Sequence, residues 1–232
     1  MMSTCRILIA LPSHGKFGLT GRNAGFYLSE AAYLRKAFTD AGYTVDLVSV
    51  QGGRPPMDGI DPSDPVQQAF HDDPQMSAKL ANTPRPDQVN FADYDVILYA
   101  GGHGTMCDFP DSTSLAEIAR DIYQSNGVVA AVCYGPTGLV NIILSDGWYL
   151  VDGTRSRHSR TTKKPPSASR RGPFQLQTQF EQRGAKHSSA PNFQPWVVRD
   201  GRLVTGQNPA SATGVAAQVL TILDHEIGHR LS

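Results

Sequence analysis

Long apolar segments are missing from this chain of 232 residues. Its first apolar run, Cys5–Leu11, is far shorter than the roughly 20 residues needed to cross a bilayer. No basic stretch precedes this run, and a polar turn follows it, so we interpret it as a buried strand and not as a signal peptide. The sequence therefore predicts neither a membrane anchor nor a secretion signal.

Net charge is also missing, because 21 Lys and Arg residues balance 21 Asp and Glu residues. Such a chain gives no electrostatic reason to expect nucleic acid or an anionic membrane as a partner. Cysteine is scarce, and an odd count of three predicts free thiols in a reducing compartment instead of a disulfide scaffold. We therefore expect a cytoplasmic globular protein without a nucleic-acid or membrane partner.

What the chain does contain is a regular alternation of strand and helix patterns. Segments with helical character, Gly25–Gly42 and Ser114–Gly127 among them, separate short apolar runs at Cys5–Leu11, Tyr43–Val50, Tyr94–Gly102 and Val128–Cys133. Strands that are apolar throughout predict a mostly parallel sheet covered on both faces, which is a flavodoxin-like three-layer α/β sandwich. No repeat or clear linker divides the chain, so residues 1–232 are predicted to form a single domain.

The remaining segments extend this pattern. Gly135–Gly147 is predicted to be a helix, Asp200-Gly201 the turn of a hairpin, and the segment from Asn208 a C-terminal helix with proline at its first position. The proline-rich segment 51–90 is expected to pack near a sheet edge. Because parallel sheets bind ligands at the carboxyl ends of their strands, we expect the functional site at the glycine-rich turns that lie there.

One cysteine, Cys133, lies between a strand and a glycine-proline turn in the stretch AVCYGP. A sharp strand-to-helix turn between small residues, here Ala131 and Gly135, holds a nucleophile in a strained and exposed conformation. The start of the following helix would place N–H groups and positive potential near the sulfur, which predicts a lowered thiol pKa. A buried core cysteine is the simpler alternative. The turn pattern favours the nucleophile.

A metal-binding pattern occurs near the C-terminus, where His225 and His229 belong to HEIGH, a literal match to H-E-x-x-H. Histidines four apart share a helix face, but the few residues that follow leave no room for a third zinc ligand on that side. We interpret the match as a solvated helix end and predict no bound metal.

A basic stretch, Arg155–Arg171, holds seven of the 21 basic residues. It could bind an anionic substrate or a phosphate group. Because it is interleaved with Ser, Thr and Pro and lacks aromatic residues, we interpret it as an exposed, solvated loop.

Several separated motifs resemble the ThiJ/PfpI superfamily, the relatives of class I glutamine amidotransferase domains. They are AVCYGP, YAGGHGTMCDFPDS, the early SHG, TG and YLSE, and the late DGRLVTGQNPAS. The resemblance runs from about Ile7 to about Leu220 and is closest to the glyoxalase III and heat-shock chaperone branch. It implies the sandwich fold with a cysteine on a nucleophile elbow, and a homodimeric, cofactor-free enzyme of lyase type.

The resemblance also implies roles for individual residues. Cys133 matches the reactive cysteine, and Glu30 matches the helix-borne glutamate that hydrogen-bonds the sulfur. Gly102 and His103 lie where the family places backbone donors that face the substrate oxygen. His14 lies in the loop at the rim of the same pocket. These five residues form the predicted site together with Tyr134, which is predicted to take part in catalysis.

Tyr134 departs from that branch, in which a histidine follows the cysteine. Since tyrosine has an ordinary pKa near 10, it is a hydrogen-bond donor and a poor base at neutral pH. We predict that Glu30 transfers protons, with His14 or His103 as helpers, and that Tyr134 orients the substrate. The alternative that Tyr134 only packs against its neighbours stays open. Cys107 is a second departure, because relatives commonly carry a bulky aromatic residue there.

The leading functional prediction is a glyoxalase III-like conversion of a small carbonyl compound, from 2-oxoaldehyde to 2-hydroxy acid. The Cys133 thiolate adds to the aldehyde, Glu30 moves a proton between adjacent carbons, and water releases the acid. Two alternatives stay open. One is a divergent lyase, hydratase or isomerase acting on a specialised biosynthetic metabolite, and the other is a redox-sensing or chaperone-like stress protein.

Overall fold

The computed structural model of this protein describes residues 5–17, 21–153, 155–156, 176–187, 191 and 194–230. A six-stranded sheet with the strand order β11-β12-β8-β7-β1-β5 forms its centre. The strands are β1 (Arg6–Leu11), β5 (Thr44–Ser49), β7 (Val96–Tyr99), β8 (Val128–Val132), β11 (Val197–Asp200) and β12 (Leu203–Gly206). All neighbours pair in parallel except β11, which pairs antiparallel with β12. The predicted mostly parallel sheet is confirmed.

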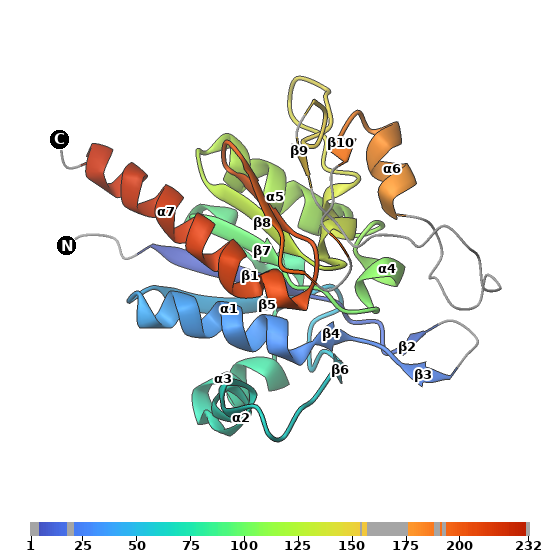
Figure 1. Ribbon diagram of the computed structural model, residues 1–232, viewed down its shortest axis with the longest axis vertical. Helices are drawn as coiled ribbons and strands as arrows, with labels where there is room; N and C mark the ends of the chain where they lie inside the picture. Colours follow the sequence, from blue (N-terminus) through green and yellow to red (C-terminus); the bar gives the residue numbers. More distant parts are fainter. Residues whose placement is uncertain are drawn as a thin grey trace.

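Alternate residues of the strands pack into two separate hydrophobic cores, one on each face of the sheet. In β1, Ile7 and Ile9 point into one core, whereas Leu8 and Ala10 point into the other. This period of two places most residues of the parallel strands in one of the two buried layers. The first core lies under α1 (Leu28–Asp40) and α7 (Ala212–Arg230), which lie side by side across the sheet in Figure 1, and the second lies under α5 (Thr113–Gln124) and α6 (Leu176–Gln182). The predicted three-layer sandwich is thereby confirmed.

The proline-rich segment packs beside β5, the edge strand, as predicted. It contains two short helices, α2 (Pro65–Asp72) and α3 (Pro74–Ala81), and each begins with proline after an aspartate whose carboxylate accepts backbone N–H groups of the first turn. The Lys79 ammonium of α3 donates to the Val45 carbonyl and to the Asp46 carboxylate of β5. These hydrogen bonds attach the segment to the sheet.

Short elements lie around the sheet, and several of those at its carboxyl end shape the site described below. The two-residue strands are β2 (Lys16–Phe17), β3 (Arg22–Asn23), β4 (Phe26–Tyr27), β6 (Met57–Asp58), β9 (Arg155–Ser156) and β10 (Lys186–His187). The short helices are α4 (Thr105–Asp108) and the 3-10 helices η2 (Pro86–Gln88), η3 (Phe91–Asp93), η4 (Gly135–Leu139) and η6 (Pro209–Ser211).

The predicted helix Gly135–Gly147 is wrong, because only the single 3-10 helix η4 forms there. A β-carbon at Gly135 would lie 2.1 Å from the Tyr99 carbonyl oxygen, and one at Gly138 would lie 2.4 Å from the Tyr99 ring. These glycines let the chain press against β7, but glycine and proline are poor helix formers. After η4 the chain turns back on itself, and Ile143 forms an isolated antiparallel bridge with Tyr149.

The C-terminal part follows the prediction. Strands β11 and β12 form a hairpin around Asp200-Gly201, and Pro209 opens η6, which leads into α7. The H-E-x-x-H match lies in the last turns of α7. Among the described helices, none combines the length and the apolarity needed to cross a membrane.

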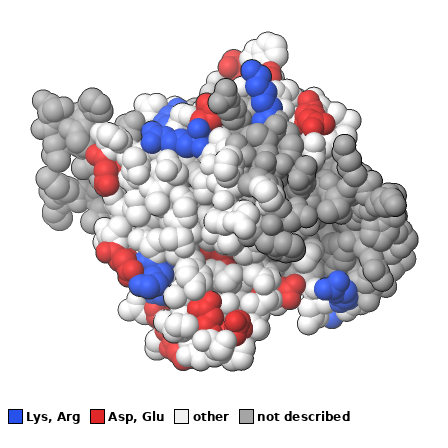
Figure 2. Space-filling model, viewed as in Figure 1, with Lys and Arg blue, Asp and Glu red and all other residues white. Residues whose placement is uncertain are grey.

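Charged side chains of both signs are mixed around the face of the molecule shown in Figure 2. The described part of the basic stretch Arg155–Arg171 is β9, which pairs in parallel with β10. The prediction of a solvated loop for the rest of this stretch lies outside the described residues.

Candidate active site

Cys133 occupies the turn between β8 and η4, at the carboxyl end of the sheet. Its φ is +58°, a left-handed conformation that non-glycine residues rarely adopt, and this is the backbone geometry expected of a nucleophile elbow. The Cys133 N–H donates to the Gly206 carbonyl of β12 at 2.9 Å, which holds the turn against the sheet. The side chain is almost entirely buried. Strain that the fold sustains at a cysteine is typical of a functional position.

Glu30 comes to this cysteine from α1, on the same face of the sheet. Its side chain is fully buried, and Oε2 accepts the Gly101 N–H at 2.7 Å. The Cys133 thiol hydrogen-bonds the Glu30 carboxyl, whose Oε1 has no nitrogen or oxygen partner within the described part of the chain. The fold therefore pairs one thiol with one carboxyl, away from bulk water.

Burial sets the protonation of this pair. It raises the pKa of Glu30 from its ordinary 4.5 to about 8, against the opposing effect of the Gly101 N–H. A carboxyl with this pKa keeps its proton at neutral pH. Glu30 can therefore act as a general acid at neutral pH and, once it has lost its proton, as a base.

The predicted lowering of the Cys133 pKa is wrong. Burial and the neighbouring Glu30 carboxylate raise the pKa of this thiol well above its ordinary value, although two backbone N–H groups act in the opposite direction. The expected positive potential is small because η4 is a short 3-10 turn and not a long helix. Glu30 raises the pKa of the Cys133 thiol only while the carboxylate is charged. A protonated Glu30 carboxyl instead donates a hydrogen bond to the sulfur and favours the thiolate.

Alkylation of Cys133 by iodoacetamide is expected to begin at a lower pH in Glu30→Gln than in the wild type. Glutamine acquires no charge, so the thiolate escapes the repulsion that grows in the wild type as Glu30 ionises above about pH 8. Peptide mapping of the alkylation rate across a pH series measures this. Cys107, on α4, is the internal control, because its profile should be the same in both proteins. If the Cys133 profiles of the two proteins superimpose, the charge of Glu30 does not affect the pKa of the Cys133 thiol and the prediction is wrong.

Two backbone N–H groups, those of Gly102 and Tyr134, donate toward the Cys133 sulfur. Gly102 has a φ of +117°, and a β-carbon there would lie 2.1 Å from the Gly25 carbonyl oxygen, so the turn after β7 requires glycine at this position. The hydroxyls of Thr105 and Thr137 hold the Tyr134 carbonyl at 3.0 and 2.8 Å. The two amides are thus fixed in place, where they can stabilise an oxyanion formed on a substrate held by the sulfur.

The His103 and Tyr134 rings meet above this turn. Their centroids are 5.4 Å apart, with a tilt of 39° between the planes. His103 also faces Asp58 of β6, with its Nδ1 3.9 Å from the carboxylate Oδ2. Burial lowers the pKa of His103 despite the opposing effect of Asp58. Both side chains are partly exposed, so they border the site from its solvent side.

His14 belongs to the loop after β1, where a second carboxylate holds the backbone. Asp108 Oδ2 accepts the N–H groups of Ser13 and His14 at 2.6 and 3.0 Å, and burial raises the pKa of Asp108 to about 6. The His14 carbonyl lies so close to Gly104 that a β-carbon there would be 2.6 Å from it. The loops that carry His14 and His103 are therefore in contact.

The structure thus brings Cys133, Glu30, Gly102 and Tyr134 together and places His103 beside them. Sequence reasoning missed the carboxylates of Asp58 and Asp108. Asp58 belongs to no motif, and Asp108 lies within the stretch YAGGHGTMCDFPDS but was given no role there. Both approach the site through tertiary contacts. Within the described residues, no group of three or more His, Cys, Asp and Glu side chains could hold a metal ion. That the protein works without metal or cofactor stays a prediction.

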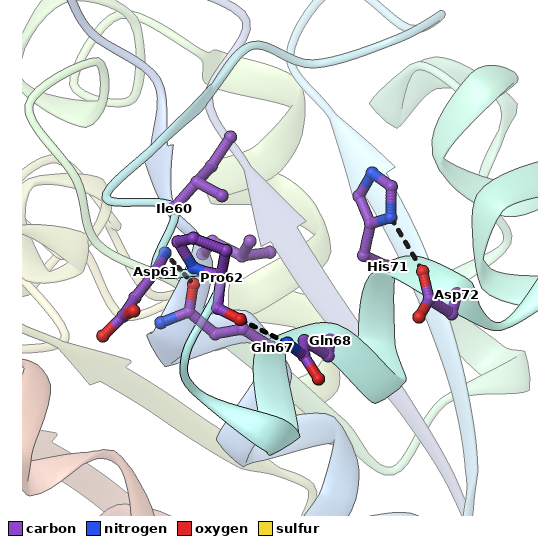
Figure 3. A pocket seen from close by; sticks show the side chains of 8 residues that line it. Ile60, Asp61, Pro62, Gln67, Gln68, His71 and Asp72 are labelled. Atoms are coloured by element: carbon purple, nitrogen blue, oxygen red, sulfur yellow. Dashed lines mark hydrogen bonds and ion pairs between the residues drawn. The ribbon is translucent and has the colours of Figure 1, made fainter.

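A separate groove with a volume of about 180 Å³ lies beside α2. Figure 3 shows that its wall comes from the loop before α2 and from α2 itself, with Gln67 accepting the Asp61 N–H at 2.9 Å. Its lining is Leu28, Ile60, Asp61, Pro62, Gln67, Gln68, His71 and Asp72. None of the predicted site residues lines this groove, so it is distinct from the cysteine site.

Comparison with known proteins agrees with this fold. A glutathione-independent glyoxalase of Saccharomyces cerevisiae is 30% identical, over 96% of this chain and 99% of the relative. The crystal structure of glyoxalase III from Candida albicans superposes with a TM-score of 0.85 at 27% identity, covering 94% of this chain and 97% of that one. Rapid Encystment Protein 24 kDa of Francisella tularensis superposes with a TM-score of 0.88 at 32% identity, covering 95% and 99% of the two chains.

The match extends to a family description. The DJ-1/PfpI family model matches residues 22–148, which include Glu30, the turn after β7 and the whole segment around Cys133. The predicted resemblance to the ThiJ/PfpI superfamily is confirmed. This chain belongs to the DJ-1/PfpI family.

Proposed function

We propose that this protein is a glutathione-independent glyoxalase, which converts a 2-oxoaldehyde into a 2-hydroxy acid. The observation that carries the proposal is the buried Cys133–Glu30 pair beneath two backbone N–H donors. Relatives that span nearly the whole chain are named as glutathione-independent glyoxalases. The cysteine takes the part that glutathione plays in a glutathione-dependent reaction, because it supplies the sulfur that binds the aldehyde.

The reaction starts once the Cys133 thiol has lost its proton to solvent while Glu30 keeps its own, so that the pair holds a single proton. The Cys133 thiolate attacks the aldehyde carbon, and Glu30 gives its proton to the oxygen, which yields a neutral hemithioacetal. The Glu30 carboxylate then removes the hydrogen from this carbon, and the electron pair moves into the adjacent carbonyl. The Gly102 and Tyr134 amides stabilise the resulting enediolate oxygen.

The second half of the reaction restores the enzyme. After a proton passes from the first oxygen to the second, Glu30 returns its proton to the second carbon, and the product is a thioester of Cys133. Water adds to the thioester, the carbon–sulfur bond breaks, and the hydroxy acid leaves. Glu30 suits the carbon-to-carbon transfer because its carboxyl is buried, so the proton does not exchange readily with solvent.

Turnover of methylglyoxal and phenylglyoxal without glutathione is the expected result, with the hydroxy acid as product. Loss of the dicarbonyl and formation of the acid can be followed by chromatography. Cys133→Ala should remove turnover, and Cys107→Ala is the matched control that should keep it. Absence of turnover in the wild type, together with selective peroxide oxidation of Cys133, would contradict the proposal and favour the redox-sensor alternative.

Three further expectations accompany this proposal and stay predictions: a single domain, a homodimer and a cytoplasmic location. The three cysteines are free thiols, which supports a reducing compartment. Light scattering coupled to size-exclusion chromatography measures the oligomeric state.

A further inference from the structure

The hydrolytic half of the proposed reaction needs a base that the buried pair does not supply. Water must lose a proton as it attacks the thioester, but the Glu30 side chain is fully buried and not accessible to bulk water. No histidine adjoins Cys133 in the chain, because Tyr134 follows it. The base must therefore come from another element.

His103 is placed to meet this need. It directly follows Gly102, whose N–H donates toward the Cys133 sulfur, and its ring packs against Tyr134, whose N–H does the same. The imidazole is 44% exposed, so water can reach it. It thus lies next to both amide donors of the oxyanion site, at the solvent side of the thioester.

Asp58 orients this imidazole. Its Oδ1 accepts the Gly59 N–H at 2.9 Å, and Oδ2 is left facing His103 Nδ1 at 3.9 Å. This distance is longer than a direct hydrogen bond, but catalytic hydrogen bonds often close only when substrate is bound. A proton held on Nδ1 by the carboxylate leaves Nε2 as the atom that can accept a proton from water.

Backbone hydrogen bonds hold Asp58 and His103 in this relation. Strand β6 pairs in parallel with β4, and Asp58 is the register partner of Tyr27. The Tyr27 N–H in turn donates to the Gly101 carbonyl at 2.9 Å, and the Gly104 N–H donates to the Gly25 carbonyl at 3.2 Å. The turn that carries His103 is thus attached on both sides to the strand beside Asp58. Such support from rigid elements is what a catalytic pair requires.

We infer that His103, oriented by Asp58, is the general base that activates water for hydrolysis of the Cys133 thioester. Nε2 takes one proton from water as the hydroxyl bonds to the acyl carbon, and the tetrahedral oxyanion lies on the Gly102 and Tyr134 amides. Collapse breaks the carbon–sulfur bond and expels the thiolate. The imidazolium then returns its proton to the Cys133–Glu30 pair, and the released acid loses its own proton to solvent.

The charged groups around His103 suit a base at neutral pH. Burial and Arg22 of β3 lower its pKa, Asp58 raises it, and Tyr134 is the titratable ring in contact with it. Burial is the largest of these effects, so the imidazole is neutral near pH 7 and can accept a proton.

The test is a kinetic trap of the thioester, and it rests on the proposed function. His103→Gln with methylglyoxal is expected to lower kcat by about 10²–10³-fold. One aldehyde per enzyme should still be consumed in a burst. Intact mass should show a covalent adduct on Cys133, and hydroxylamine should release it as a hydroxamate, which a hemithioacetal does not give. His71→Gln, an exposed substitution on α2, is the matched control with unchanged kcat and no adduct.

Asp58 is a positioning residue, so its test is the pH profile. Asp58→Asn should shift the acidic limb of the kcat profile to lower pH, since the variant loses the charge that raises the His103 pKa, and Asp58→Glu should partly restore the wild-type profile.

Wild-type kcat in His103→Gln, or a lowered kcat without thioester accumulation, would overturn the inference while the proposed function stands. A wild type that neither turns over nor forms an adduct would overturn both.

Discussion

Glu30→Gln is expected to lower kcat for a 2-oxoaldehyde by about 10²–10⁴-fold, the range that general acid–base catalysis contributes. The amide has nearly the same shape as the carboxyl and can still accept the Gly101 N–H, but it cannot move a proton between the two substrate carbons. Steady-state kinetics with methylglyoxal measures the loss.

Tyr134→Phe is the matched comparison for this variant. If the tyrosine hydroxyl only orients the substrate, its removal costs roughly 1–2 kcal/mol, which is a loss of about fivefold to thirtyfold in kcat/KM. A tyrosine variant as damaged as Glu30→Gln would show that the hydroxyl is itself the acid or base, and would contradict the assignment of proton transfer to Glu30.

The same glutamine variant should be more stable than the wild type at alkaline pH. Glu30 has a pKa of about 8 in the folded protein and an ordinary value near 4.5 when unfolded, so the folded state holds a proton that the unfolded state has lost between these values. Stability of the wild type therefore falls as pH rises through this window. Above about pH 8 the variant should gain on the order of 4 kcal/mol in the free energy of unfolding relative to the wild type, since one pKa unit corresponds to about 1.4 kcal/mol.

Denaturant unfolding of both proteins at a series of pH values measures this difference. The two free energies of unfolding should diverge as pH rises from about 5 to 9. Parallel curves over this range would mean that Glu30 titrates normally in the folded protein, which is incompatible with its burial.

Gly101→Ala is expected to damage both folding and catalysis. A β-carbon there would lie 2.6 Å from Glu30 Oε2, 2.7 Å from the Val132 carbonyl oxygen and 2.8 Å from the β-carbon of Cys133. The added methyl must push Glu30 and Cys133 out of place and strain the hydrogen bond that the carboxyl accepts. Overpacking together with loss of this hydrogen bond should cost about 2–4 kcal/mol in the free energy of unfolding.

The kcat of this variant should fall by about 10²-fold or more even where the protein is fully folded. Misplacement of a catalytic group by about 1 Å is sufficient for such a loss. Gly15→Ala is the matched control, since its β-carbon would meet only Pro56, at ordinary contact distances of 3.5 and 3.6 Å. The prediction is tested by measuring the thermal unfolding temperature and the kcat of both variants. If Gly101→Ala behaves like Gly15→Ala, the close packing around the pair is not needed.

Much of the fold could be predicted from the sequence because its cues are local. Apolar runs such as Cys5–Leu11 and Val128–Cys133 indicated buried strands, the helical segments between them indicated parallel pairing, and the stretch AVCYGP indicated the turn at Cys133. The prediction for Gly135–Gly147 was wrong because close packing of Gly135 and Gly138 on Tyr99, a tertiary contact, prevails over the local apolar pattern.

The chemistry of the site depended on the tertiary structure. Family motifs pointed to Cys133 and Glu30, which lie on different elements, but the direction of the thiol pKa followed from burial, which local sequence does not report. Asp58 has no motif and approaches His103 only through the pairing of β4 with β6. The sequence alone determined which reactive groups the chain carries, because these follow from residue type and local turns. Tertiary structure decided how they are protonated and which of them meet, because desolvation and long-range contacts exist only in the folded chain.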